Sequence, residues 1–495
     1  MLGQRRALPE LAAHGAWDAV VIGGGITGAG IALEAARRGH KVLLLEQRDF
    51  SWGTSSRSSK MVHGGLRYIA QGDIQLTRHA LQERERLLAE LPDLVVRMPY
   101  VFPIRQGRFP GRWPMTFILK LYDALAGIRD HRWMSRDEVR QAYPALNDAG
   151  LRGAMRYTDA LTDDSRLVIR VLQEAALEGA RARNYTEVLD IKAQGDMHEL
   201  LVQDTNTDNG ARLTLHARHV FNATGLWADR LSGTPPVVRP QRGTHLFVAA
   251  SRLPVRDCLT ILHPDDHRPV FVFPWKGQTC IGTTDIDHRE GLQDEPHCTP
   301  AEIDYLLKVA NSELPALHLR REDVLATMAG VRPIIASGKG KDPSKERRDH
   351  LVWQANGVIS VSGGKLTTFR QIALDALKAA GLIDAATHRQ AHQGRHLRCF
   401  RHAVPSPHGL NDPVRGTASG GVLQAQVEWI LTHEMVVHLD DLLLRRLRLG
   451  VLCADAGESL LLSLKPMCQL YLGWDEARWQ WECTRYRAVI ASSYR

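Results

Sequence analysis

One stretch, residues 17–46, constrains the fold of this chain more than any other part of the sequence. It reads WDAVVIGGGITGAGIALEAARRGHKVLLLE, in which a short apolar run comes directly before three consecutive glycines. Such a run predicts a buried parallel strand, and the alanine-rich segment after the glycines predicts a helix. The helix is expected to end at Gly39, and KVLLLE to form a second strand that closes on Glu46. The stretch therefore predicts a strand–helix–strand unit of an open α/β sheet.

The glycines of this unit have the spacing Gly23-x-Gly25-x-x-Gly28, which is typical of a dinucleotide-binding turn. Gly23 permits the tight turn, Gly25 lets the backbone approach a pyrophosphate, and Gly28 lets the helix pack closely on the strand. The free N–H groups and partial positive charge of the helix N-terminus favour phosphate. Glu46 is placed to accept a hydrogen bond from a ribose hydroxyl. Three neighbours complete the predicted nucleotide site: Ile26, Thr27 and Gln47.

Two later segments indicate that the dinucleotide is FAD and not NAD. Residues 216–229, HARHVFNATGLWAD, are predicted to form a strand that ends in the turn Ala223-Thr224-Gly225, with a helix behind it. Residues 356–377 repeat the pattern, with Gly363-Gly364 ahead of a helix that begins near Leu366. Each segment brings a glycine turn to the carboxyl end of a strand, where open α/β sheets bind ligands. A helix dipole near Leu366 also suits the pyrimidine edge of a reduced flavin.

The stretch SSRSSKMVHGGLRYIAQGD, residues 55–73, is rich in hydrogen-bond donors. Four serines, two arginines, a lysine and a histidine lie within it, close after the predicted strand end at Glu46. This composition points to a large anionic ligand. Over the whole chain, Lys+Arg 63 against Asp+Glu 55 gives a formal net charge of +8, which suits an anionic substrate or membrane surface and does not by itself indicate nucleic acid.

Several motifs resemble those of the aerobic, FAD-dependent glycerol-3-phosphate dehydrogenase family. They are the nucleotide unit, SSRSSKMVHGGLRYI, TDDSRLV (162–168), GTTD (282–285), GVRP (330–333) and SGGKLTTFR (362–370). The resemblance runs in order from residue 17 to about residue 385, and its most specific parts are SSK-x-x-HGGLRY and GGKLTT. It implies an α/β fold in which a Rossmann-like FAD-binding domain carries a β-rich substrate domain and a C-terminal helical cap.

The expected domain boundaries follow from these placements. The FAD-binding domain is discontinuous, over 17–103, 137–235 and 325–392, and the β-rich substrate domain covers 236–324. The C-terminal helical domain is expected over 393–495. The remaining segment, 104–136, is a candidate for contact with a membrane.

The resemblance implies that the chain is an enzyme. Members of the family oxidise sn-glycerol 3-phosphate to dihydroxyacetone phosphate by hydride transfer to FAD and pass the electrons to a membrane quinone such as ubiquinone. Two other interpretations stay open: an FAD-dependent oxidase of a small amine or hydroxy acid, and a non-catalytic flavin-binding sensor. The number of cations among the motifs favours a phosphate, because a carboxylate needs only one arginine. A homodimer is possible, and no nucleic-acid partner is expected.

The resemblance also assigns residues to the flavin. The loop from Thr54 to Leu66 is expected to wrap the cofactor, with Gly64-Gly65 allowing the backbone close to the isoalloxazine ring. The expected flavin contacts of this loop are Thr54, Ser55, Ser59, Lys60, His63, Gly64, Gly65 and Leu66. Those of the two later turns are Ala223, Thr224, Gly225, Gly364, Lys365, Leu366 and Thr367.

A set of cations is expected to bind the substrate phosphate, because the arginine side chain offers a planar fork of donors. The predicted substrate-binding residues are Arg67, Tyr68, Arg332, Arg348 and Lys365, with Arg347 an equally good chemical alternative to Arg348. The predicted catalytic residues are Arg332, His245 and Lys365. His245 is the candidate base for the substrate hydroxyl proton. Arg332 is an alternative, as a cation that stabilises the developing alkoxide, and the sequence does not decide between them.

Residues 104–136 combine six arginines and a lysine with aromatic and aliphatic side chains. Basic residues beside interfacial aromatics on a short amphipathic helix suit a surface anchor facing anionic lipid. The alternative is that Phe117, Leu121 and Leu125 pack on the protein core. The N-terminal residues lack the apolar run of a secretory signal. We therefore expect a cytoplasmic protein that is bound peripherally to the inner face of the cell membrane.

No metal site is predicted. The seven cysteines never approach CxxC spacing, which favours a reducing compartment and argues against zinc. His433, Glu434 and His438 have metal-like helical spacing, but a solvated helix face is the expected explanation for them.

Overall fold

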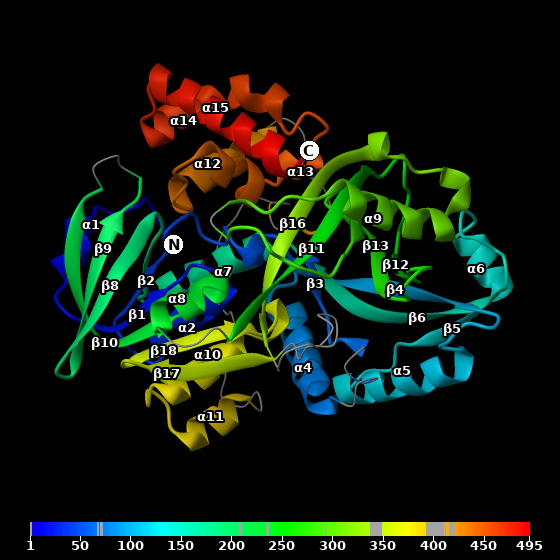
Figure 1. The fold of residues 1–495 in the computed structure, drawn as a ribbon, viewed down its shortest axis with the longest axis horizontal. Helices are drawn as coiled ribbons and strands as arrows, with labels where there is room; N and C mark the ends of the chain where they lie inside the picture. Colours follow the sequence, from blue (N-terminus) through cyan, green and yellow to red (C-terminus); the bar gives the residue numbers. More distant parts are fainter. Residues whose placement is uncertain are drawn as a thin grey trace.

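The computed structural model describes residues 2–66, 69, 73–206, 210–233, 237–292, 294–336, 349–392, 410, 412–414 and 421–495. Two sheets organise this part of the chain, and a group of C-terminal helices stands over both of them (Figure 1). Near the N-terminus, Gly3 forms an isolated parallel bridge with Glu434, which directly follows helix α12, Gly421–His433.

The first sheet has the strand order β17-β18-β10-β1-β2-β7, and β9 and β8 extend it from β10. Its core strands β18, β10, β1, β2 and β7 are parallel, so their carboxyl ends meet at one edge. The strands are β1 Trp17–Ile22, β2 Val42–Leu45, β7 Arg181–Arg183, β8 Thr186–Gln194, β9 Met197–Asp204, β10 Arg212–Asn222, β17 His350–Ala355 and β18 Val358–Gly363.

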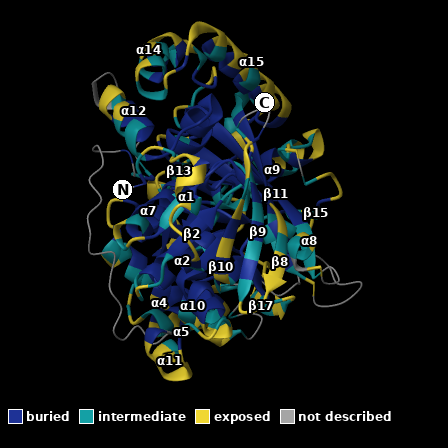
Figure 2. Ribbon diagram, turned by 90° about the vertical axis from the view of Figure 1, so that its left-hand side faces the viewer, coloured by how far each residue is buried: buried dark blue, intermediate teal, exposed yellow. Residues whose placement is uncertain are grey.

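Three helices pack together against this sheet: α2 Ile26–Ala36, α7 Asp164–Leu177 and α10 Phe369–Ala379. Helix α2 is almost entirely buried because it lies between the other two (Figure 2). The predicted strand–helix–strand unit of residues 17–46 is thus confirmed as β1, α2 and β2. Smaller helices complete this half: α1 Leu8–Ala12, α8 Ala228–Ser232 and α11 Ala385–His392.

The second sheet has the order β15-β11-β14-β13-β12-β4-β6-β3, with β16 beside β11 and β5 beside β6. Its strands are β3 Met61–Val62, β4 Val95–Arg105, β5 Arg132–Ser135, β6 Leu151–Thr162, β11 Val238–Ala249, β12 Cys258–Leu262, β13 Pro269–Trp275, β14 Gln278–Gly282, β15 Ile286–Asp287 and β16 Val324–Ile335. Four helices belong to this half: α4 Ile74–Glu90, α5 Arg112–Ala126, α6 Arg136–Ala142 and α9 Pro300–Glu313.

The second sheet recruits strands that the sequence assigned to the FAD-binding domain. β4 pairs with β6 in antiparallel register from Val95↔Thr162 to Arg105↔Leu151, and β12 joins the pair by lying parallel to β4. The expected boundary at residue 103 therefore cuts through β4. The difference arises because the partner of β4 lies about fifty residues later, and the alternation of a strand does not reveal which sheet it joins.

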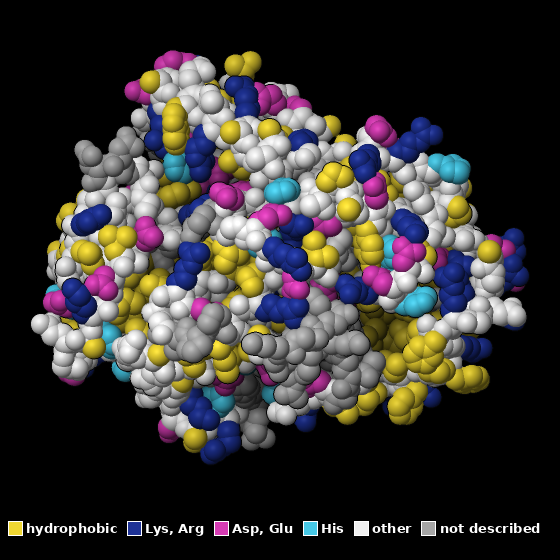
Figure 3. Space-filling view, viewed as in Figure 1, with side chains coloured by type: hydrophobic (Ala, Val, Ile, Leu, Met, Phe, Trp, Pro, Cys, Tyr) yellow, Lys and Arg dark blue, Asp and Glu magenta, His cyan; other side chains and the backbone are white. Residues whose placement is uncertain are grey.

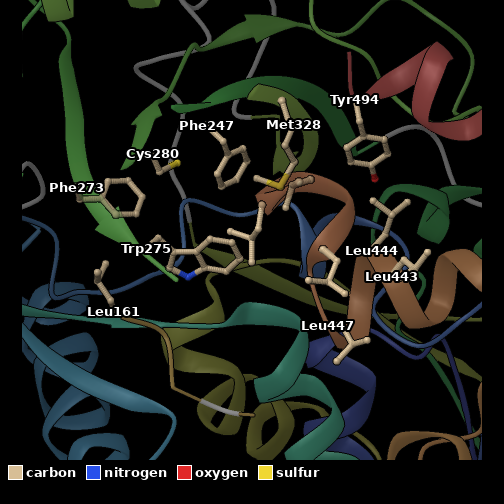
Figure 4. Close-up of a cluster of buried hydrophobic side chains, with 14 of the residues drawn as sticks. Leu161, Phe247, Phe273, Trp275, Cys280, Met328, Leu443, Leu444, Leu447 and Tyr494 are labelled. Atoms are coloured by element: carbon tan, nitrogen blue, oxygen red, sulfur yellow. The ribbon is translucent and has the colours of Figure 1, made fainter. Parts of the chain in front are cut away.

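The C-terminal helices share a core with the second sheet. They are α12 Gly421–His433, the π-helical segment η7 Asp441–Arg446, α13 Leu449–Leu452, α14 Leu461–Leu472 and α15 Glu476–Ser493. Figure 4 shows Phe247, Trp275 and Met328 of the sheet in one cluster of buried side chains with four C-terminal residues: Leu443, Leu444, Leu447 and Tyr494. The cap is therefore an integral part of the fold.

Buried ion pairs also join the cap to the first sheet. Asp49, after β2, accepts hydrogen bonds from Arg445 at 2.6 Å and from Arg446 at 2.7 and 2.8 Å, and all three side chains are buried. Glu434 is wholly buried and takes a bidentate pair from Arg166 at 2.6 and 2.8 Å. The expectation that Glu434 lies on a solvated helix face is therefore wrong.

His438 is likewise buried, and its Nδ1 lies 2.8 Å from the Glu482 carboxylate. Sequence spacing could not show these contacts, because the partners lie on other elements.

Among the described residues, no helix combines the length and the apolar character needed to cross a membrane.

Candidate functional site

A cavity of about 420 Å³ lies at the carboxyl edge of the first sheet. Many of the predicted cofactor residues line it: Gly23, Gly25, Ile26, Thr27, Glu46, Gln47, Thr54, Ser55, Ala223, Thr224, Gly225, Gly364, Lys365 and Leu366. The turns after β1, β10 and β18 meet here because these neighbouring strands are parallel. The sequence did not predict the other walls, which include Trp52, Gly53, Ser58, Thr186, Glu187, Val188, Leu189, Trp227, Arg230 and Ser362.

The glycine turn has no room for a side chain at Gly23 or Gly28. Gly23 has φ +112°, and a Cβ there would lie 2.5 Å from the Ala223 carbonyl oxygen. A Cβ on Gly28 would lie 1.9 Å from the Gly23 carbonyl oxygen, which is far inside van der Waals contact. The third glycine, Gly25, is the residue before α2 and faces the cavity. This is the close helix–turn packing that a pyrophosphate-binding turn requires.

Glu46 closes one end of the cavity. Its carboxylate accepts hydrogen bonds from the Gly24 N–H at 2.6 Å and from the Arg48 N–H at 2.8 Å. Burial raises the pKa of Glu46, and the two backbone hydrogen bonds partly offset that effect. Ser55 approaches from the opposite side, where its Oγ accepts from the Ile26 N–H at 3.0 Å. The serine-rich loop is thereby tied to the start of α2.

Much of the hydrogen-bonding capacity of the loop is used within the protein. The Ser58 N–H and hydroxyl both donate to Asp164, at 2.9 and 2.7 Å. The Lys60 ammonium is fully buried and donates to Asp164 at 2.7 and 2.9 Å and to the Ser56 carbonyl at 2.8 Å. Burial lowers the pKa of Lys60 to about 8, although Asp164 acts in the opposite direction.

Some predicted cofactor residues do not line the cavity: Gly28, Ser59, Lys60, His63, Gly64, Gly65, Leu66 and Thr367. Gly64 is instead held from helix α5, which the sequence did not suggest. Its N–H donates to the Tyr122 hydroxyl oxygen at 2.9 Å and more weakly to Asp159 at 3.3 Å. The Tyr122 hydroxyl donates to Asp159 at 2.7 Å, and Arg84 donates to the same carboxylate at 2.6 Å.

The two central catalytic candidates lie on adjacent strands, His245 on β11 and Arg332 on β16. Each stands over a glycine of a neighbouring strand. A Cβ on Gly282 would lie 2.1 Å from the His245 ring, and a Cβ on Gly243 would lie 2.1 Å from the Arg332 guanidinium. Glycine at both positions therefore makes room for the two side chains, and this pairing was not evident from the sequence.

His245 is fully buried and its Nε2 lies 3.0 Å from the Ser59 hydroxyl. Burial lowers its pKa well below the usual value, and the cations Lys60 and Arg332 add to the effect. Its imidazole is therefore neutral near pH 7. Arg332 donates to Asp285 at 3.2 Å and to the Thr283 hydroxyl at 3.0 Å, which fixes the guanidinium.

Arg332 also adjoins the cavity along the chain. The carbonyl of its neighbour Val331 accepts from the Thr54 hydroxyl at 2.6 Å, and Pro333 lines the cavity. Lys365 reaches the same cavity from the end of β18. The other predicted substrate residues, Arg67, Tyr68 and Arg348, and the alternative Arg347, lie outside the described residues.

Comparison with known proteins identifies the family. Residues 18–373 match the FAD dependent oxidoreductases, and residues 406–479 match the C-terminal domain of alpha-glycerophosphate oxidase. The chain is 35% identical over 524 residues to glycerol-3-phosphate dehydrogenase 2 of Mycobacterium tuberculosis, across 96% of this chain and 88% of that relative. The chain belongs to the FAD-dependent glycerol-3-phosphate dehydrogenase family.

Two further members extend the comparison. The aerobic glycerol-3-phosphate dehydrogenase of Bacillus subtilis is 36% identical over 367 residues, across 72% of this chain and 65% of that relative. The glycerol-3-phosphate dehydrogenase from Bacillus halodurans complexed with FAD has a TM-score of 0.75 and 25% identity, across 98% of this chain and 96% of that one. The predicted fold class, with its FAD-dependent enzyme core and helical cap, is confirmed.

The cavity of this family member fits FAD. The crowding at Gly23 and Gly28 leaves a turn that only glycines allow, and the start of α2 opens into the cavity. Glu46 stands at the end of β2, where a ribose hydroxyl is bound in dinucleotide sites. Gly364 and Lys365 form the opposite end, ahead of the helical turn Leu366–Thr368. The glycine turn and Glu46 would hold the nucleotide, and Gly364 and Lys365 would hold the ring system.

Proposed function

We propose that this chain oxidises sn-glycerol 3-phosphate to dihydroxyacetone phosphate and passes the electrons to a membrane quinone. The substrate assignment rests on two neighbouring residues. One is Arg332, which Asp285 and Thr283 hold in place, and the other is the buried, neutral His245. A guanidinium fixed in this way offers two or more N–H donors to a phosphate. Relatives named glycerol-3-phosphate dehydrogenase support the same substrate.

In this proposal Arg332 binds the substrate phosphate and His245 takes the proton of the C2 hydroxyl. Bound FAD supplies the two-electron acceptor to which the C2 hydrogen moves as hydride. Burial and, in addition, the nearby cations Lys60 and Arg332 disfavour a positive charge on His245 and lower its pKa. A substrate phosphate bound at Arg332 would offset that repulsion and raise the proton affinity of His245 when substrate is present. Lys365 supplies a further cation at the end of β18.

The substrate assignment is tested by replacing Arg332 with Ala and measuring steady-state turnover with a soluble dye. One lost charge-assisted hydrogen bond costs about 1.5–3 kcal/mol, so kcat/KM should fall roughly tenfold to a hundredfold. FAD content should stay unchanged. The matched control is Arg252→Ala, because Arg252, just after β11, also pairs with an aspartate, Asp323, just before β16, at 2.7 and 2.9 Å. Equal losses in both variants, or equal turnover of glycerol and glycerol 3-phosphate, would contradict the proposal.

We further propose that helix α5 attaches the protein to the membrane. Phe109, Trp113 and Phe117 are spaced four residues apart and are 78%, 75% and 72% exposed. The opposite side of the helix packs on the core through Met115 and Leu119. Hydrophobic side chains gather at the lower right of Figure 3, where Figure 1 places α5. Such an apolar stripe beside basic residues suits the lipid interface.

The basic part of this surface differs from the sequence expectation. Arg108 and Arg112 are exposed, and Arg112 lies over the Trp133 ring at 4.5 Å. Arg105 is buried and forms an ion pair with Glu313, so it does not face lipid. The strand position of Arg105 turns its side chain toward α9, which the composition of residues 104–136 does not reveal.

Vesicle flotation tests this attachment. Serine at Phe109, Trp113 and Phe117 should release the protein from anionic vesicles while dye-linked activity persists. Serine at Leu462 and Leu470 of α14 is the matched control, because these side chains are 84% and 74% exposed but lie elsewhere. A triple variant that floats like the parent protein would show that α5 is not the anchor. Long-chain ubiquinone, which stays in the bilayer, should restore turnover without dye only for proteins that bind the same vesicles.

A further inference from the structure

A second, larger cleft of about 770 Å³ lies between the first sheet and the C-terminal helix α15. Arg48 and Trp52 line the side of the first sheet, and Arg478, Trp481 and Arg485 line the side of α15. Figure 1 shows α14 and α15 standing over the half of the molecule that holds this sheet. Trp52 also lines the cofactor cavity, but the proposed oxidation of glycerol 3-phosphate uses no residue of α15.

The arginines of this cleft are arranged on tryptophan rings. The Arg48 guanidinium lies 3.9 Å from the centre of the Trp52 ring. Arg478 and Arg485 lie 4.7 and 5.9 Å from the centre of the Trp481 ring, which is 51% exposed. Stacking of this kind fixes the guanidinium plane and leaves its N–H edge to bind an oxyanion. A half-exposed tryptophan between two arginines is also a surface on which a planar ring can stack.

Carboxylates hold two of these arginines in position. Arg478 pairs with the buried Glu482 at 2.8 Å, and Arg485 pairs with Asp440. Asp440 also pairs with Arg445 at 2.7 Å, and Arg445 is shared in turn with Asp49 and Asp441. The ion pairs thus orient the arginines of the cleft.

Two buried polar atoms on the cleft wall have no hydrogen-bond partner among the described residues. They are the Nε of Arg478, a donor, and the Oδ1 of Asn206, an acceptor. Buried polar groups in folded proteins are nearly always hydrogen-bonded. Arg478 and Asn206 therefore each keep one hydrogen-bonding atom that no described residue satisfies.

We propose that this cleft binds a nucleotide: a planar ring that stacks on Trp481 and a phosphate group that the arginines hold. The cleft shares Gln47, Trp52 and Glu187 with the cofactor cavity. An occupant therefore touches the outer side of the wall that surrounds FAD.

Calorimetric titration of the FAD-loaded enzyme with ADP, adenosine and inorganic phosphate tests this site. ADP should bind once per chain, and adenosine and phosphate should each bind at least about tenfold more weakly, because each offers only one of the two interactions. Flavin absorbance should not change. Displacement of FAD by ADP, or phosphate binding as tightly as ADP, would overturn the proposal.

Variants locate the ligand. Arg478→Gln and Trp481→Ala should each weaken ADP binding about tenfold or more. Trp481 is half exposed, so its replacement keeps the test valid if the loss of Arg478 impairs folding. Arg487→Gln is the matched control, because Arg487 lies on the same helix but pairs with Glu458 outside the cleft. Unchanged ADP binding by Trp481→Ala would refute the site, and oxidation of glycerol 3-phosphate should continue in every variant.

Discussion

Replacing Tyr122 with Phe should disturb the expected flavin loop, because Tyr122 of helix α5 holds Gly64 of that loop in place. The substitution removes the hydroxyl that accepts from the Gly64 N–H at 2.9 Å and donates to Asp159 at 2.7 Å. It leaves the Gly64 N–H with only the 3.3 Å contact to Asp159. All of these groups are buried, so water cannot easily replace the lost partner.

The magnitude follows from the groups that lose a partner. A buried group left unsatisfied costs about 1–3 kcal/mol, and the free energy of unfolding should fall by that amount. Gly64 is packed closely against both α4 and α5, because a Cβ there would lie 2.5 Å from Leu81 and 2.7 Å from the Tyr122 hydroxyl oxygen. If the Gly64-Gly65 backbone holds the flavin ring, its displacement should also lower kcat by roughly tenfold to a hundredfold.

Urea unfolding followed by flavin fluorescence, together with dye-linked kinetics, measures both effects. Tyr157→Phe is the control, because Tyr157 is buried against Tyr122 with ring centres 6.2 Å apart but has no bond to Gly64. Both variants should lose stability, and only Tyr122→Phe should change kcat and the flavin spectrum. Equal kcat in the two variants would show that Tyr122 supports the core and nothing more.

Two other predictions concern the glycine turn and the effect of pH. Gly28→Val should abolish FAD binding, measured as bound flavin per chain, because the added Cβ would lie 1.9 Å from the Gly23 carbonyl oxygen; a variant with full flavin content would refute the close packing. Burial acts to lower the pKa of His350, but hydrogen bonds to Asp349 and Asp375 raise it to about 9. The raised pKa means that this stabilisation is complete below the unfolded value near 6.5 and is lost as pH rises through about 9. The difference in unfolding free energy between the parent protein and His350→Gln should therefore shrink from pH 6 to pH 10, and a constant difference would contradict it.

The nucleotide half of the site was predictable because it is local. The turns after β1, β10 and β18 each show a glycine pattern in the sequence, and the parallel pairing of these strands brings the turns to one edge of the sheet. The serine-rich loop was harder to interpret. Its composition indicates a ligand, yet Ser58 and Lys60 bond to Asp164. Asp164 lies about a hundred residues later, so no local pattern could distinguish a partner within the chain from a bound anion.

The same limit explains the domain boundaries and the buried charges of the cap. β4 and β6 have ordinary strand patterns, and they join the second sheet because they pair with each other and β4 also pairs with β12. The charged run around Glu434 resembles a solvated helix face until Arg166 is known to face it. Contacts between distant segments decide both cases.

The most direct test of the central claim is the anaerobic reduction of the flavin by glycerol 3-phosphate in a stopped-flow experiment. The substrate is used with hydrogen and with deuterium at C2, and the loss of flavin absorbance is followed in each case. The account predicts that glycerol 3-phosphate bleaches the flavin, that deuterium slows the reaction several-fold, and that glycerol and glycine leave the flavin oxidised. Bleaching by glycine, or a flavin that glycerol 3-phosphate does not reduce, would contradict hydride transfer from C2 of this substrate.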